Sequence, residues 1–330
     1  MKSIHFIGQH MSHPEFEFVI APRLEQDVLE YYQTIRFAPI PEGVDYEDHQ
    51  KNIDQEFKRK LSGYFSGWRR MMMACMQEHL YFSFWLDKFF QAYCSVLGQE
   101  RINFFEVTAQ RSAGFYTDKI VKKLRILFES TSLTEEMHKQ NERYEKRIEK
   151  LRESYRNTSQ IYPDAVDLKL ELSLNDVCSE IIDIRQLSQY LSNFQNSLAT
   201  VFWYRTQVVY RFYRIVRDAV QQRYMIHFYL TFNQSLYCGP LGYCHDIEQH
   251  WLSATRYMGT CMCLEVNQQH TRWDAEQALR IDRILQEEAL CPLGALNEMP
   301  ENQTGQNGLA TRICIYPKGF EWFRGAPVRG

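Results

Sequence analysis

The chain has 330 residues, of which 45% are hydrophobic, 14% aromatic and 24% charged. This content is enough for one large or two ordinary domains, and it excludes a wholly disordered or collagen-like chain. Acidic residues outnumber basic ones by 41 to 38, so no global positive field indicates nucleic-acid binding, and only local patches could provide it.

The sequence carries no membrane or export signal. The first ten residues lack the apolar run of a signal peptide, and no stretch approaches about 20 uninterrupted apolar residues. The best candidate, 80–97, contains Asp87, Lys88 and Gln91 and fits a buried helix better than a membrane span. The nine cysteines are odd in number and mostly scattered, unlike a disulfide framework. We therefore expect a cytoplasmic protein with no membrane partner.

The first half of the chain is predicted to be mainly helical. Residues 1–50 contain four prolines between short apolar runs, which favours short elements and loops. Apolar residues then follow helical spacing over 53–98 and again over 117–128. We expect a helical N-terminal module that extends over 1–160.

The segment 134–155 carries the clearest helical pattern. A Ser-x-x-Glu capping box, from Ser132 to Glu135, stands at its start. A narrow apolar stripe follows, made of Met137, Tyr144, Ile148, Leu151 and Tyr155. Such a stripe on a charged helix fits a helical hairpin or partner helix, or a solvated helix that leans on the domain by one edge. The residues around 157–163 end this helix and mark the expected domain boundary.

The second half, 161–330, changes to mixed periodicity. Residues 166–172 alternate between apolar and polar side chains, as in a half-buried strand. Further strands are predicted at 201–216, 223–232, 259–266 and 312–316, and helices at 178–198, 246–256 and 273–290. This order predicts an α+β domain, in which an antiparallel sheet carries helices on one face.

The run Tyr224–Asn233 resembles the central strand of replication initiators that nick single-stranded DNA. In that superfamily two histidines flank one hydrophobic residue, so that both imidazoles lie on one face of the strand and hold a divalent ion. The specific resemblance is to the inovirus-type, YagK/YfjJ-like C-terminal domain, and it covers 161–330. The segments Ile315–Lys318 and Phe323–Gly325 are similar to the Tyr-x-x-Lys element and the Arg/Phe/Gly-rich tail of these domains.

This resemblance implies a catalytic tyrosine, Tyr316, and a histidine, His227, that would bind Mg²⁺ or Mn²⁺ for attack on a DNA phosphate. Met225 stands where the first histidine belongs, and its thioether is a poor ligand for these ions. A proline follows the tyrosine, and the lysine lies one residue too close. Asp167 and Glu171 are the expected carboxylate neighbours. The sequence therefore predicts a degraded nicking site or, alternatively, an ordinary core or surface histidine.

A cluster of cysteines and histidines raises the separate question of structural zinc. Its members are Cys238, Cys244, His245, His250, Cys261 and Cys263. Zinc needs four such ligands in a tetrahedron, but the spacing differs from the common motifs. Free cysteines are also ordinary strand and core residues, so structural zinc is not expected.

Arginine and tyrosine residues interleave around the strand predicted at 201–216. Six are candidate contacts for single-stranded nucleic acid: Arg205, Tyr210, Arg211, Arg214, Arg217 and Arg223. Guanidinium groups pair with phosphates and aromatic rings stack on bases. The alternative is a sheet face that arginines keep solvated while the tyrosines pack inward.

The leading functional hypothesis combines these observations. The sequence contains no phosphate-binding loop, dinucleotide-binding turn, nucleophile elbow or zinc-protease motif. We expect a DNA-binding, replication-initiator-like protein of a prophage or mobile element, with single-stranded or hairpin DNA as its partner. If it were active, it would be a metal-dependent tyrosine DNA nickase. The rival hypothesis is a helical protein-interaction or regulatory factor that does not bind nucleic acid.

Overall fold

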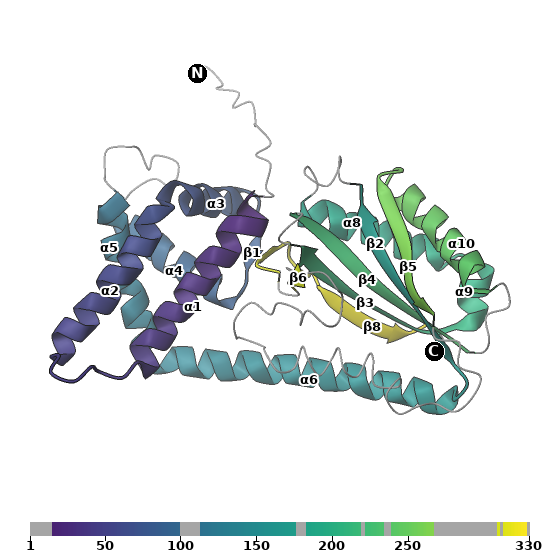
Figure 1. The fold of residues 1–330 in the computed structure, drawn as a ribbon, viewed down its shortest axis with the longest axis horizontal. Helices are drawn as coiled ribbons and strands as arrows, with labels where there is room; N and C mark the ends of the chain where they lie inside the picture. Colours follow the sequence, from purple (N-terminus) through teal and green to yellow (C-terminus); the bar gives the residue numbers. More distant parts are fainter. Residues whose placement is uncertain are drawn as a thin grey trace, which may run out of the picture.

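A computed structural model gives the architecture of the chain. It describes residues 15–99, 113–175, 183–218, 222–233, 239–266, 309–310 and 313–328. A lobe of helices and a lobe built on an antiparallel sheet lie next to each other, and one long helix runs along both (Figure 1). The α+β class predicted from the sequence is confirmed.

The helical lobe is formed by the N-terminal part of the chain. Its elements are η1 (Phe16–Ile20), α1 (Ala21–Phe37), α2 (Tyr46–Gly63), α3 (Phe65–Gln77), β1 (Tyr81–Phe82), α4 (Phe84–Gln99) and α5 (Ala113–Glu129). Aromatic residues such as Trp68, Trp85, Phe89 and Phe128 fill its core, which explains the helical spacing of the sequence. No helix among the described residues is both long and apolar enough to cross a membrane.

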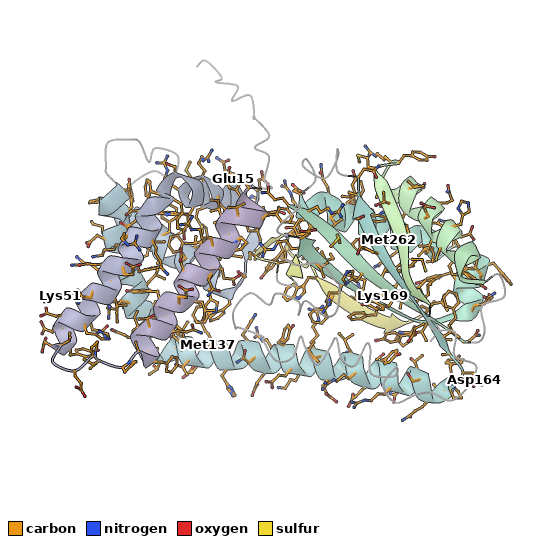
Figure 2. All side chains as sticks on the ribbon, viewed as in Figure 1. Glu15, Lys51, Met137, Asp164, Lys169 and Met262 are labelled. Atoms are coloured by element: carbon orange, nitrogen blue, oxygen red, sulfur yellow. The ribbon has the colours of Figure 1, made fainter. Side chains whose placement is uncertain are left out.

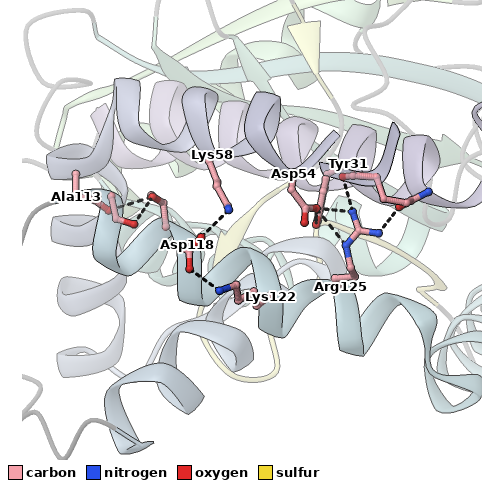
Figure 3. Close-up of polar contacts among 10 residues, drawn as sticks. Tyr31, Asp54, Lys58, Ala113, Asp118, Lys122 and Arg125 are labelled. Atoms are coloured by element: carbon pink, nitrogen blue, oxygen red, sulfur yellow. Dashed lines mark hydrogen bonds and ion pairs between the residues drawn. The ribbon is translucent and has the colours of Figure 1, made fainter. Parts of the chain in front are cut away.

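Polar contacts on the outside of this lobe fix α2 against α5 and α1. Asp54 on α2 pairs with Arg125 on α5 and accepts a hydrogen bond of 2.6 Å from Tyr31 on α1 (Figure 3). Lys58 donates to Asp118 across the same helix pair at 2.6 Å, and this bond holds the pKa of the Asp118 carboxyl below its usual value. These half-exposed pairs orient the helices, while the buried aromatic core supplies most of the stability.

The second lobe contains a six-stranded antiparallel sheet. Its elements are β2 (Val166–Leu174), α8 (Ile184–Leu198), α9 (Phe202–Gln207), β3 (Val208–Asp218), β4 (Arg223–Phe232), α10 (Gly239–Ala254), β5 (Gly259–Val266), β6 (Leu309–Ala310) and β8 (Phe323–Pro327). The strand order is β5-β2-β4-β3, with β6 and β8 both paired to the outer edge of β3. The chain order β2-α8-β3-β4-α10-β5 is that of a ferredoxin-like unit. That architecture supports many functions and does not by itself identify one.

Several predicted boundaries need correction. The strand predicted at 201–216 begins only at Val208, because Phe202–Gln207 forms the helix α9. A long-range contact favours that helix, since the Trp203 indole donates to Asp246 on α10 at 2.9 Å. The helix predicted at 246–256 begins earlier, at Gly239. The helix predicted at 273–290 lies outside the described residues.

The two faces of the sheet differ in what covers them. On one face, β2 leucines such as Leu170 and Leu172 pack against Phe194 of α8 and Trp251 of α10. The helices that follow β2 in the chain therefore lie on one face, as expected for 161–330, but the sheet as a whole has helices on both faces. The opposite face packs against α6 (Thr131–Ile161), which sequence reasoning did not predict.

Helix α6 contains the segment 134–155 and leans by one edge, as in one of the two alternatives expected, but the surface on which it leans is the sheet of the second lobe. The Ser130 hydroxyl caps its first turn, two residues before the predicted cap. The apolar stripe near Ile148 and Tyr155 contacts the sheet, and no second helix takes that place among the described residues. The helix ends at Ile161, near the predicted boundary.

The two lobes also share direct contacts. The strand β7 (Ile315–Tyr316) lies near the C-terminus but pairs with β1 of the helical lobe. Cys314 and Ile315 are buried in the core of that lobe. On the other side of the junction, the Tyr224 hydroxyl of β4 donates to the buried carboxylate of Glu17 in η1.

Candidate functional site

His227 lies near the middle of the large sheet. It stands on β4, directly opposite Glu171 of β2 on one side and Arg214 of β3 on the other. Residues that oppose each other in an antiparallel ladder project from the same face, so the three side chains form one row across the sheet. His227 and Arg214 are each only 1% exposed. The row faces away from α8 and α10, toward the side where α6 packs.

The imidazole of His227 is held neutral. Burial, together with the nearby charges of Arg214 and Lys169, lowers its pKa to about 3. Its Nε2 lies 3.9 Å from Glu171 Oε2, which is too long for a hydrogen bond, and its Nδ1 has no hydrogen-bond partner. Burial has the opposite effect on the carboxyl of Glu171, whose pKa it raises. A neutral imidazole with a free nitrogen is a competent ligand, but two cationic neighbours oppose a metal cation.

The surroundings of His227 provide few further metal ligands. Met225 is fully buried and lies two residues earlier on the same face of β4. Glu171 is the nearer of the two predicted carboxylates, because Asp167 lies four residues further along β2 and accepts hydrogen bonds from Tyr155 and Thr231. Within the described ranges, no group of three or more histidine, cysteine or acidic side chains is arranged to hold a metal ion.

Tyr316 is not on the sheet that carries His227. It belongs to β7, which pairs with β1, and its hydroxyl donates to the Phe82 carbonyl at 2.9 Å. It lines a cavity of about 570 Å³ together with Lys88 of α4 and Arg143 of α6. The structure therefore does not bring the two predicted catalytic residues into one ladder or one strand.

The six predicted nucleic-acid contacts do not form one exposed patch. Arg205 on α9 is exposed, and Arg211 and Arg223 are half-buried, whereas Tyr210, Arg214 and Arg217 are buried. Because side chains alternate along β3, Tyr210 and Arg214 face α6 while Arg211 and Arg217 face the opposite side. Arg217 donates to the Glu17 carbonyl at 3.0 Å and so connects the two lobes.

The face toward α6 contains an aromatic and cationic group that the sequence analysis did not assemble. Phe212 of β3 and Tyr229 of β4 oppose each other, with ring centroids 5.7 Å apart. Lys169 of β2, marked in Figure 2, opposes Tyr229 and lies over its ring at 5.7 Å. Tyr210 and Arg214 flank Phe212 on the same face. We call these five residues the inner-face cluster. Three of them, Tyr210, Phe212 and Arg214, stand at alternate positions of β3, and this two-residue spacing in the sequence could have indicated that they share a face.

The residues considered for structural zinc are spread over several contacts. Cys244, Cys261 and Cys263 are half-buried where α10 meets β5. His245 is exposed and lies 3.8 Å from Glu248, while His250 Nδ1 is hydrogen-bonded to Ser197 Oγ at 2.6 Å. Cys238 lies outside the described residues.

Comparisons with known proteins do not indicate a function for these residues. No protein-family model, curated protein or solved structure matches the chain. The resemblance to replication initiators therefore stays a prediction, carried by the residues of β4 and of the C-terminal segment.

Proposed function

We propose that the protein binds single-stranded nucleic acid through the inner-face cluster of its sheet, with single-stranded or hairpin DNA of a prophage or mobile element as the partner. The observation that carries this proposal is the shared face of Phe212, Tyr229 and Tyr210 beside Lys169 and Arg214. Aromatic side chains on the central strands of such a sheet stack on unpaired bases, and cationic groups next to them pair with phosphates.

Only the Lys169 end of this cluster is accessible, because its other four members are at most 5% exposed. Met262, on the edge strand β5, is 50% exposed, and Lys169 on the neighbouring strand is half-exposed. The side near β3 is covered by α6, where Tyr155 packs edge-on against Tyr210 with ring centroids 5.3 Å apart. Nucleic acid would contact Lys169 first and would reach the rings of Tyr210 and Phe212 only when α6 moves away.

Strand nicking is not part of the proposal. A tyrosine nickase needs its hydroxyl close to a phosphate that a metal ion polarises. The Tyr316 hydroxyl donates a hydrogen bond to the Phe82 carbonyl, and the carboxylate that lies beside His227 within the described part of the chain is Glu171, at 3.9 Å. These features favour a protein that binds DNA without forming a covalent tyrosyl–DNA intermediate.

Fluorescence anisotropy with a labelled oligothymidine over a series of salt concentrations tests the proposal. Binding should weaken steadily between about 50 and 200 mM salt, as expected for phosphate contacts. Lys169→Ala should lower the affinity and reduce the salt slope by about one. The matched control is Lys146→Ala, because this side chain is 78% exposed on α6. No binding at low salt would refute the proposal and favour the protein-interaction factor.

A further inference from the structure

Three cysteine side chains meet where α10 packs on the edge strand β5. Cys261 and Cys263 oppose Leu172 and Leu170 of β2, and therefore share the face of the sheet that α8 and α10 cover. Cys244 projects from the N-terminal part of α10 into the same apolar cluster. All three thiols are free and half-buried.

The side chains of Cys244 and Cys263 lie next to each other across the contact between α10 and β5. The Cys244 thiol is hydrogen-bonded to Cys263, and the nearby Cys261 acts on it electrostatically. A disulfide requires two cysteines whose side chains already approach each other, and the hydrogen bond between these two thiols brings their sulfur atoms together. A soft metal ion would need three or four converging ligands, and although Cys261 lies nearby, no three histidine, cysteine or acidic side chains among the described residues are arranged to hold one. The contact therefore suits a bond between the two sulfurs better than a metal site.

We propose that Cys244 and Cys263 are an oxidisable pair, which closes into an intramolecular disulfide between α10 and β5 when the protein meets a disulfide oxidant such as oxidised glutathione. In the first step, one protein thiolate attacks the oxidant, forms a mixed disulfide and releases one glutathione thiolate. In the second step, the other protein thiolate attacks the mixed disulfide and releases the second glutathione. The two protein thiols lose two electrons and two protons, and the oxidant is reduced to two thiols.

The environment makes this pair slow rather than hyper-reactive. Burial and the Cys263 thiol raise the pKa of Cys244, and burial raises the pKa of Cys261 to about 12. Thiolate is therefore scarce at neutral pH. As long as the pH is below the pKa of Cys244, each increase of one pH unit should raise the rate of closure through Cys244 about tenfold. Such a pair would respond to sustained oxidation and not to brief exposure.

Mass spectrometry of the full chain tests the inference. The protein is incubated with oxidised glutathione at mildly alkaline pH, and its remaining thiols are then alkylated. We expect the intact mass to fall by two hydrogen atoms, with two fewer alkylated cysteines and one cross-linked peptide pair that joins Cys244 to Cys263. A link from Cys244 to Cys261 or Cys238, or complete alkylation of the pair, would overturn the proposal.

Two variants sharpen this result. Cys263→Ser should abolish the cross-link and accumulate the glutathione adduct on Cys244. Cys94→Ser, which removes a half-buried thiol of α4 in the other lobe, should leave the cross-link unchanged. If Cys263→Ser fails to fold, the peptide map of the unmodified chain still decides between the pairings.

Discussion

Removal of the Tyr155 ring should detach α6 from the sheet without unfolding the sheet. Tyr155 is only 1% exposed, packs against Tyr210, and donates a hydrogen bond of 3.2 Å to Asp167. Only a few residues of this 31-residue helix are buried, and Ile148 is the main other anchor on the sheet. We therefore expect Tyr155→Ala to act mainly on the contact between α6 and the sheet.

The size of the effect follows from the contacts that are lost. Truncation of a buried aromatic side chain to alanine costs about 3 to 5 kcal/mol. If all of it is taken from the docking of α6, the undocked population rises by about two to three and a half orders of magnitude, since about 1.4 kcal/mol corresponds to a factor of ten. Tyr155→Phe keeps the ring and loses the hydroxyl with its hydrogen bond to Asp167. It should cost about 0.5 to 1.5 kcal/mol, because Thr231 still donates to that carboxylate.

Native-state hydrogen exchange measures this directly. In Tyr155→Ala, amides of residues 144–158 should exchange about a hundredfold faster, or more, while amides at the centre of β4 keep their rates. Equal acceleration of the β4 amides would refute the reasoning, because α6 would then unfold only together with the sheet. If the inner-face cluster binds nucleic acid, the same variant should also bind oligothymidine more tightly. Unchanged affinity would locate binding on another surface.

Three other predictions concern single residues. Burial raises the pKa of Glu17 to about 8, so its stabilising contribution is complete below about pH 4.5 and is lost as the pH rises through 8. Urea unfolding at pH 5 and pH 8 should show this loss, and Glu17→Gln should flatten it; an unchanged pH dependence in the variant would contradict the assignment. Tyr316→Phe should cost about 1 kcal/mol through the lost bond to Phe82 and leave DNA binding unaltered, and denaturing gels should show no tyrosyl–DNA adduct in the unmodified protein. Met225→His should increase the affinity for Mn²⁺, measured by calorimetry, because residues 225 and 227 share a face of β4; no gain would count against the initiator resemblance.

Local patterns predicted much of the fold. The two-residue alternation of 166–172 and the helical stripe of 134–155 depend only on neighbours in the sequence, and both elements are present as β2 and α6. The α+β class follows from the order of such elements. Elements that depend on distant contacts were harder to predict. Phe202–Gln207 is rich in aromatic residues, and such a composition favours a strand. The segment is nevertheless a helix, and its Trp203 side chain donates a hydrogen bond to Asp246 of α10, a distant residue in the sequence.

The candidate site was less predictable for a similar reason. The sequence singled out His227, Arg214 and Tyr210, which do share one face of the sheet. It grouped them with Arg211 and Arg217, although two-residue alternation along the strand places these two arginines on the opposite face. It also could not reveal that α6 covers that face, since no local pattern links residue 155 to residue 210.

The pairing of β7 with β1 has a consequence for synthesis on the ribosome. Cys314 and Ile315 complete the core that the helices of the N-terminal lobe begin, and Ile315 pairs with Phe82. At about 5 to 20 residues per second, tens of seconds separate the emergence of Phe82 from that of Ile315. During this interval the nascent helical lobe exposes apolar surface that its own residues do not cover. Newly made chains should therefore be captured by chaperones through this lobe, and a premature stop codon before residue 314 should make it aggregate although every one of its helices has been translated.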